Sequence, residues 1–409
     1  MRYPRKLGSS AAPLPRKVGL RGAARIEETG QVAVAGDVRF ARRELDCLGH
    51  AGLDSFAYRQ QAARKLHQVV PYDAVWWWTT DPATSFFTSG MFEPHPNVAC
   101  RAVHVNEFVE PDHNKFRVLA RRQAHVALLS DATDADLKRS RRYRNVLRPE
   151  GLEHELRLAL VSESTCWGAL ALLRATDAPD FSTAEARKAA QLTEVLAEGL
   201  RIGLVMGAIA TESPSEGPGL IALDDDDRVL AITPSAEHWC RELGQKPPAL
   251  PEAVMSIAAC VRHIDDGANG EPLTLRARMR TGSGRWLVAH GSRVQQGTAM
   301  AGSTAVIIEE AKPAEVAPLI VRAYGLSERE AELTRLVLHG LSTKEIAAEM
   351  LLSPYTVQDY LKSVFEKVDV RSRRELVARI FDQYYWPRYG HGDRTPDWHG
   401  SPAGLRDSP

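Results

Sequence analysis

Cysteine is scarce in this sequence, and the few thiols form no recognisable set. Five cysteines are spread over 409 residues without a CxxC pair, at Cys47, Cys100, Cys166, Cys240 and Cys260. An odd, dispersed set does not suit a disulfide framework, so we expect reduced thiols in a cytoplasmic protein. Cys100 could join His104 and His113 in a metal or haem site, but their spacing matches no standard ligand set. We therefore expect no metal and no cofactor.

Long apolar segments are absent as well. The best candidate, residues 200–210, is interrupted by Arg201 and is too short to cross a bilayer. The basic N-terminal stretch has no apolar core of the kind that a secretory signal requires. These two absences predict a protein without membrane contact.

Net charge and catalytic motifs are also missing. Lys+Arg and Asp+Glu both number 52, so no excess of basic residues indicates a nucleic-acid partner. Any DNA affinity must then depend on where individual charges lie, and a dimer would be needed for useful strength. No glycine-rich phosphate loop, nucleophile elbow or metal motif stands at the proper spacing, and we expect no enzyme activity.

What the sequence does contain is a series of well-marked helix starts in residues 325–381. Three serines each stand three positions before a glutamate, which is the capping-box pattern: Ser327 and Glu330, Ser342 and Glu345, Ser372 and Glu375. A fourth helix starts at Ser353 with Pro354 in its first position, where a missing N–H costs nothing. Apolar residues recur at helical spacing after each start, and only a few residues join the second helix to the third. This arrangement predicts a helix-turn-helix.

The third of these helices carries polar residues opposite its apolar stripe. Gln358, Asp359 and Lys362 are donors and acceptors of the kind that read base edges in the major groove. Hydroxyl groups and free N–H groups in the first turn can hold a phosphate, and the residues that open the second helix can touch the opposite strand. The predicted DNA-binding residues are Thr343, Lys344, Ser353, Tyr355, Thr356, Gln358, Asp359 and Lys362.

Three motifs in this stretch resemble the DNA-binding domain of LuxR-type (GerE-type) bacterial transcription regulators. They are residues 326–330 (LSERE), 340–347 (GLSTKEIA) and 353–357 (SPYTV). The resemblance implies double-stranded DNA and RNA polymerase as partners, and a homodimer on DNA. This chain has Gln358 and Tyr360 where the family commonly has Lys and His, so no base preference is carried over. An ordinary helical packing module without DNA contacts is the alternative.

Residues 41–210 have the pattern of an antiparallel sheet with flanking helices. Helices are predicted at 42–48, 55–70 and 137–147, strands at 74–80, 85–91, 155–162 and 167–174, and a long helix from Ser182 to about 210. That order resembles a GAF domain, a sensing module, most of all through residues 167–174 (WGALALLR) and 180–185 (DFSTAE). The resemblance implies a small-molecule effector or a protein partner.

Two features of this domain leave alternatives open. Trp76 and Trp78 share one face of a strand and could form the aromatic wall of a ligand pocket, or they could be core residues under the flanking helices. The long helix carries a stripe with small residues, which could pack on its own sheet or bring two subunits together. The stripe consists of Ala189, Leu192, Leu196, Gly199 and Gly203.

A second sheet domain is predicted at 219–311, after a linker at 211–218, and its order of strands and helices resembles a PAS-like sensor. The acidic run at 224–227 fits a hairpin turn. A phosphorelay receiver would need a later phospho-acceptor Asp and a Lys, and neither follows in the right order. Residues 1–40 and 383–409 have the composition of disordered tails, although the first could also be a phosphate-gripping arm or a translation start placed too early.

The predicted fold class is multidomain α+β: a GAF-like antiparallel-sheet domain at 41–210, a PAS-like α+β domain at 219–311 and an all-α four-helix helix-turn-helix domain at 312–382. The predicted function is a sequence-specific DNA-binding transcription regulator whose sensors respond to a small molecule or a partner. An enzyme with a catalytic GAF-like domain would need a clustered acid–base pair. A sigma-like RNA polymerase subunit would need a helical, basic-aromatic region upstream. The sequence offers neither.

Overall fold

The computed structural model describes residues 37–96, 100–206, 216–264, 275–294, 302–312, 315–316, 319 and 322–382. The predicted tails 1–40 and 383–409 and the linker 211–218 therefore lie mostly outside the described residues. Helix α1 (Val38–Gly49) begins three residues before the predicted domain start, because the Asp37 carboxylate accepts a hydrogen bond from the Arg39 N–H and caps it.

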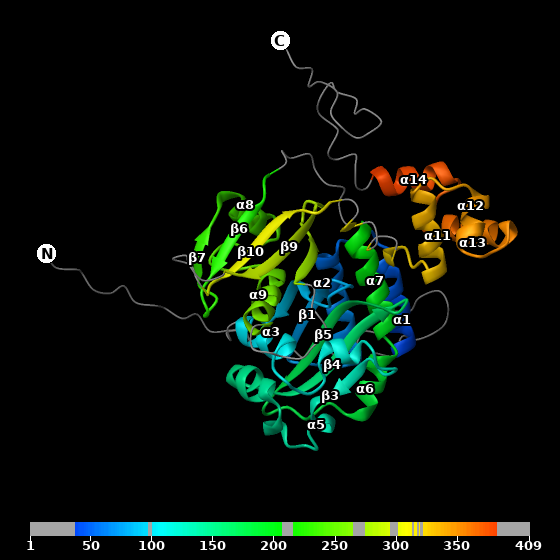
Figure 1. Ribbon diagram of the computed structural model, residues 1–409. Helices are drawn as coiled ribbons and strands as arrows, with labels where there is room; N and C mark the ends of the chain where they lie inside the picture. Colours follow the sequence, from blue (N-terminus) through cyan, green and yellow to red (C-terminus); the bar gives the residue numbers. More distant parts are fainter. Residues whose placement is uncertain are drawn as a thin grey trace, which may run out of the picture.

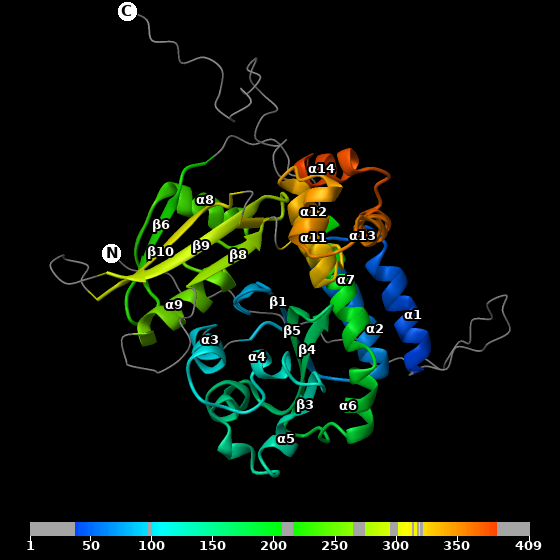
Figure 2. The same cartoon turned by 45° about the vertical axis from the view of Figure 1, so that its right-hand side comes forward.

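The first unit is built on a five-stranded antiparallel sheet in the order β2-β1-β5-β4-β3. Its strands are β1 (Ala74–Thr80), β2 (Phe87–Glu93), β3 (Val126–Leu128), β4 (Leu152–Ser162) and β5 (Thr165–Ala175). One face packs under α1, α2 (Ser55–Val69), α6 (Thr183–Ala190) and α7 (Thr193–Met206). The other packs under α3 (Cys100–Phe108), α4 (Phe116–Leu119) and α5 (Leu129–Ala132), as Figures 1 and 2 show. Both faces are buried, which explains the near-continuous apolar runs in β4 and β5.

The basic segment at 137–147 is not the continuous helix that its residues predict. It consists of a 3-10 turn, η1 (Leu137–Arg139), and a π-helical turn, η2 (Tyr143–Leu147), followed by a second 3-10 turn, η3 (Arg148–Glu150). The break lies where the Asp112 carboxylate accepts hydrogen bonds from the Ser140 hydroxyl at 3.2 Å and from the Arg142 N–H at 2.6 Å. These contacts from a distant loop override the local helix propensity.

The long helix predicted from Ser182 is also divided. Ser182 and Glu185 form the expected capping box, but α6 ends at Ala190 and α7 begins at Thr193. The small-residue stripe packs inside the unit: Leu192 and Leu196 are fully buried, and a Cβ at Gly199 would lie 2.3 Å from the Tyr58 side chain. The alternative of a dimer through this stripe is therefore wrong.

Helix α2 buries Ala63 and Leu66, as apolar spacing predicts, and a charged residue besides. Phe56, in the first turn of this helix, is 48% exposed, whereas Tyr58 and Arg59 are each 1% exposed. Position 59 faces the sheet because its guanidinium reaches the backbone oxygen of Trp77 in β1, at 2.9 Å. A charged residue thus occupies a position that apolar periodicity alone would not select.

A second five-stranded antiparallel sheet has the order β7-β6-β10-β9-β8. Its strands are β6 (Gly219–Leu223), β7 (Val229–Ile232), β8 (Arg276–Arg280), β9 (Trp286–Arg293) and β10 (Thr304–Glu310). Helices α8 (Pro234–Glu242) and α9 (Glu252–Ile264) share a core with this sheet. Helix α9 also packs against α3 and β2 of the first unit, and it lies between the two sheets in Figure 1.

The C-terminal domain consists of four helices in the described residues: α11 (Glu328–Leu338), α12 (Thr343–Glu349), α13 (Pro354–Val368) and α14 (Arg373–Asp382). They enclose a core of their own. The capping boxes of α11 and α12 are present, and Gly340 adopts φ +85° after α11. The third box differs, because Glu375 reaches back to the Arg371 N–H while Ser372 caps the Glu375 N–H. With these helices and two antiparallel sheets, the predicted fold class is confirmed.

Glu330 ties α11 to α13 and should make the domain sensitive to acid. Its carboxylate accepts hydrogen bonds from the Ser327 N–H (2.7 Å), the Ser363 hydroxyl (2.5 Å) and Lys367 Nζ (2.7 Å). Burial alone would raise the pKa of Glu330, but the hydrogen bonds from Lys367, Ser363 and Ser327 outweigh it and lower this pKa to about 2.

Because the pKa of Glu330 is lower in the folded state than in the unfolded state, its contribution to the free energy of unfolding is complete above pH 4.5. This contribution is lost as the pH falls towards 2. Glu330→Gln should lower the free energy of unfolding by about 1.5–3 kcal/mol at neutral pH. It should also flatten the acid side of the stability profile. Urea titrations across pH, with Glu332→Gln as an exposed-pair control, measure both effects. An unchanged profile in Glu330→Gln would contradict the assignment.

Candidate nucleic-acid interface

The junction between α12 and α13 sets the geometry of the helix-turn-helix. Leu351 takes a left-handed conformation at φ +55°, and its side chain is 91% exposed. The Leu352 N–H donates to the Ala347 oxygen at 2.9 Å, which closes the turn. Ser353 then caps α13 by accepting from the Thr356 N–H at 3.1 Å, with Pro354 in the first position. The chain reverses within these few residues, as the sequence predicts.

The structure divides α13 into a buried and an exposed face. Val357, Leu361 and Val364 enter the domain core. On the opposite face Tyr355 is 81% exposed, and Gln358, Asp359 and Lys362 are exposed beside it. Gln358, Asp359 and Lys362 make no side-chain hydrogen bond or ion pair with any described residue. These three side chains are therefore free to meet an external surface.

The other predicted residues lie at the two helix starts. Lys344 is exposed and Thr343 half-buried in the first turn of α12. At the start of α13 the Ser353 and Thr356 hydroxyls lie 2.9 Å apart. Ser342 and Ser353 cap these two helix starts, and both residues are exposed. The positive ends of the two helix dipoles therefore face solvent. Such ends favour phosphate oxygens.

The predicted DNA-binding residues do not include a basic segment at the start of α14. Arg371 and Arg374 are exposed, and Arg373 donates to the backbone oxygen of Leu341, just before the cap of α12. Arg373 therefore brings a positive charge to the helix start that the sequence assigns to a phosphate contact. The sequence shows that residues 371–374 (RSRR) are basic. It does not show that they lie beside α12, because tertiary packing determines that position.

Trp76 and Trp78 lie on the same face of β1, while Trp77 packs in the core on the opposite face. Trp78 is 1% exposed, stacks on Phe87 with ring centres 4.5 Å apart, and donates from Nε1 to Glu252 Oε2 of α9 at 3.1 Å. Both side chains are thus part of a packed aromatic cluster that extends to the second unit. Their role as a ligand wall stays a prediction.

The remaining polar candidates are dispersed. His104 Nε2 lies 3.1 Å from the same Glu252 carboxylate oxygen, His113 lies in a loop, and the side chain of Cys100 is outside the described residues. In the described part of the chain, no three His, Cys, Asp or Glu side chains gather as a metal would need. Within the same residues, every helix is too short or too polar to cross a membrane.

Comparison with known proteins identifies the C-terminal domain. Residues 325–380 match the family described as bacterial regulatory proteins, luxR family (GerE). The transcriptional regulatory protein DesR of Bacillus subtilis is 39% identical over 61 residues, which are 15% of this chain and 31% of DesR. This chain thus spans about a third of that relative's length. The probable HTH-type transcriptional regulator GfsR of Streptomyces halstedii is 27% identical over 189 residues, 45% of this chain and 71% of GfsR.

Among solved structures, the match to Escherichia coli SdiA covers 84% of this chain and 96% of the SdiA chain, at 10% sequence identity and a TM-score of 0.28. The match to a GAF domain/HD domain protein from Geobacter sulfurreducens covers 42% of this chain and 95% of that protein's chain, at 20% sequence identity and a TM-score of 0.24.

Proposed function

We propose that this chain, whose C-terminal domain is a LuxR-type helix-turn-helix domain, is a sequence-specific transcription regulator controlled by its two sheet-containing units. The observation that carries the proposal is the unpartnered face of α13, where Gln358, Asp359 and Lys362 stand exposed on a helix with a rigid, capped start. A helix of this kind fits the major groove, and its amide, carboxylate and ammonium groups can discriminate bases. DNA and RNA polymerase are its partners, in the cytoplasm where they meet, and it binds as a homodimer.

The capped helix starts supply the phosphate contacts in this proposal. Lys344 and Thr343 approach one strand, and Ser353 and Thr356 approach the other. Arg373, beside the start of α12, adds a charge on the first side. Because the whole chain has no net charge, these few positions provide most of the attraction, and affinity should fall with salt in proportion to the number of phosphates that they contact.

Control by the sensor units is supported by contacts at the entrance to the domain. Arg201 of α7 donates to the backbone oxygen of Ala323, a residue that packs in the core of the first unit. Two residues further along the chain, the backbone oxygen of Gly325 accepts a hydrogen bond from Lys367 Nζ of α13 at 3.0 Å. The segment that enters the DNA-binding domain is thus held between α7 and α13. A ligand or partner that shifts α7 would change how the domain is presented.

The isolated domain provides the test. A fragment of residues 318–383 is expected to fold and to bind DNA by itself, because α11–α14 have a separate core and complete caps. Circular dichroism should show a helical, cooperatively melting fragment, and mobility shift at low salt should show DNA binding. The fragment with Lys344→Ala and Lys362→Ala is the matched control and should bind more weakly. A folded fragment without any DNA affinity would refute the proposal.

A further inference from the structure

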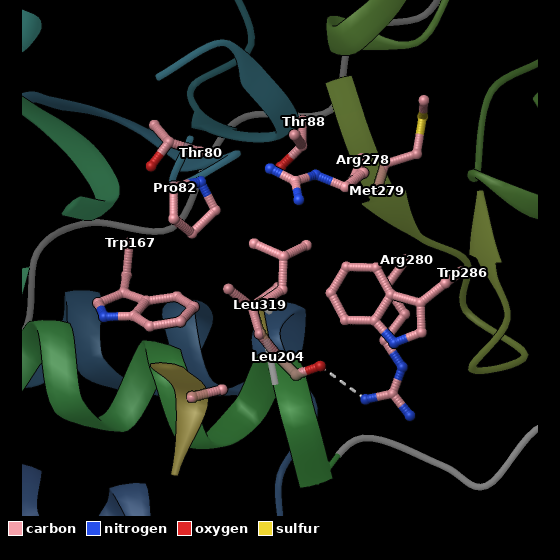
Figure 3. Close-up of a pocket in the computed structure, with 11 residues that line it drawn as sticks. Thr80, Pro82, Thr88, Trp167, Leu204, Arg278, Met279, Arg280, Trp286 and Leu319 are labelled. Atoms are coloured by element: carbon pink, nitrogen blue, oxygen red, sulfur yellow. Dashed lines mark hydrogen bonds between the residues drawn. The ribbon is translucent and has the colours of Figure 1, made fainter. Parts of the chain in front are cut away.

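A cleft of about 530 Å³ opens between the first and second units. The first unit contributes the start of α2, the end of α7 and parts of β1 and β2, and the second contributes the end of α8 and the β8–β9 turn. A smaller cavity shares Thr88, Leu204 and Arg280 with it, and Figure 3 shows Arg280 donating to the Leu204 backbone oxygen there. The cleft has the volume of a site for a small organic molecule.

Arg59, in the wall of this cleft, is a buried cation with no carboxylate within 4 Å among the residues that the structure describes. It is 1% exposed, and its guanidinium donates to the backbone oxygens of Ser55 (3.0 Å), Trp77 (2.9 Å) and Ser89 (3.3 Å), and to the Ser89 hydroxyl (3.0 Å). None of these acceptors carries a charge. Every other buried arginine among the described residues has a carboxylate within 4 Å: Arg142, Arg157, Arg174, Arg201, Arg262 and Arg278.

This exception is energetically unfavourable, since a buried charge without a partner of opposite sign loses its hydration. Burial accordingly lowers the pKa of Arg59 to about 10, and Glu252 and Asp54 offset only part of that effect. Both carboxylates are engaged elsewhere. Glu252 accepts from Trp78, and Asp54 accepts from the first N–H groups of α2. Among the described residues, the Arg59 guanidinium therefore has only neutral acceptors at hydrogen-bond distance.

We propose that the cleft binds a small organic anion whose carboxylate or phosphate group lies against Arg59. Two carboxylates also line the cleft, but Asp54 accepts from the first N–H groups of α2 and Glu242 accepts from the Ser283 hydroxyl. The other walls suit an anionic ligand. Phe56 is 48% exposed, and its ring centre lies 5.7 Å from the Arg59 guanidinium carbon, so an apolar part of the ligand can pack on the ring. Arg241, exposed on the facing wall, offers a second cation, and the Thr88 and Ser89 side chains add hydroxyl groups.

An occupant of the cleft would touch the end of α7, through Gly203 and Leu204. The Leu204 backbone oxygen accepts from Arg280 of β8 at 2.6 Å, and Arg201, one turn earlier, holds Ala323 before the DNA-binding domain. The ligand thus lies at the point where both units meet the helix that reaches the DNA-binding domain. That the anion also changes DNA binding rests on the proposed function, whereas its binding does not.

Citrate and inorganic phosphate are suitable probes, titrated into the full-length protein against chloride at equal ionic strength. Calorimetry and thermal unfolding should show binding and stabilisation by at least one of them in the wild type. Arg59→Gln should weaken binding at least about tenfold, because it removes charge-assisted hydrogen bonds. Arg59→Lys should retain part of the affinity. Arg148→Gln, an exposed arginine outside the cleft, is the matched control and should bind as wild type does.

Arg241→Gln and Phe56→Glu change exposed positions of the cleft, so they test the site even if Arg59→Gln does not fold. Both substitutions should weaken binding of the citrate or phosphate probe. The site would be overturned if neither citrate nor phosphate bound to the wild type or stabilised it more than chloride does. Equal binding by Arg241→Gln, Phe56→Glu and Arg148→Gln would also overturn it. Titration of DNA with and without citrate separates the two proposals: citrate binding by a protein that binds no DNA would refute the regulator and leave the site standing.

Discussion

Asp81→Ala is expected to lower the free energy of unfolding by about 3–5 kcal/mol, because it leaves the Arg278 guanidinium buried without its partner. The Asp81 carboxylate belongs to the β1–β2 turn and is fully buried. It accepts from the Arg278 N–H at 2.7 Å, from Nε at 3.0 Å and from Nη2 at 2.8 Å. Arg278 lies in β8, so this pair joins the two sheets.

Urea unfolding of the wild type and the variant measures the effect, and limited proteolysis should show the units separating first. Asp226→Ala is the control. Asp226 also joins the units, through Arg101 of α3 at 3.2 Å, but its side chain is 61% exposed, and such pairs contribute about 0–1 kcal/mol. Asp81→Leu combined with Arg278→Met should recover part of the loss, since no charge is left buried. Equal stability of Asp81→Ala and Asp226→Ala would show that the buried ion pair contributes no more to stability than the exposed one.

This pair illustrates what the sequence could not predict. Asp81 and Arg278 are 197 positions apart, and the sequence places Asp81 only between the strands predicted at 74–80 and 85–91. The same holds for Asp112, which breaks the segment at 137–147 from a distant loop, and for Arg59, whose burial depends on acceptors in β1 and β2. Long-range polar contacts select one geometry among many that local propensity allows.

The C-terminal domain could be predicted much further, because its determinants are local. The cap at Ser353 and the spacing of Val357, Leu361 and Val364 fix both the start of α13 and the face it buries. Once that face is known, the exposure of Gln358, Asp359 and Lys362 follows from the helical period alone. The place of Arg373 beside α12 did not follow, since it depends on how α14 packs on the other helices.

The exposed face of α13 leads to the second large effect. Gln358→Ala should relax base preference at one position of each half-site, at a cost of roughly 1–3 kcal/mol there, because glutamine can bond adenine N6 and N7 together. In the proposed homodimer the change occurs twice, so the loss on the best sequence should approach about 2–6 kcal/mol in total. A carboxylate such as that of Asp359 can accept from cytosine N4 or adenine N6 in the major groove, and it should repel a phosphate or the acceptor edge of guanine.

Lys362→Ala should behave differently from Gln358→Ala. If Lys362 contacts a phosphate, affinity should fall on all sequences alike, and the salt slope should decrease by about one per subunit. Tyr355→Ala should have a smaller effect, since Tyr355 stands in the first turn of the helix, before the positions expected to meet the bases, and its side chain is 81% exposed. Selection from random DNA with each variant, followed by affinity measurements at several salt concentrations, distinguishes loss of specificity from loss of charge. Unchanged specificity in Gln358→Ala together with an unchanged salt slope in Lys362→Ala would mean that α13 does not lie in the groove.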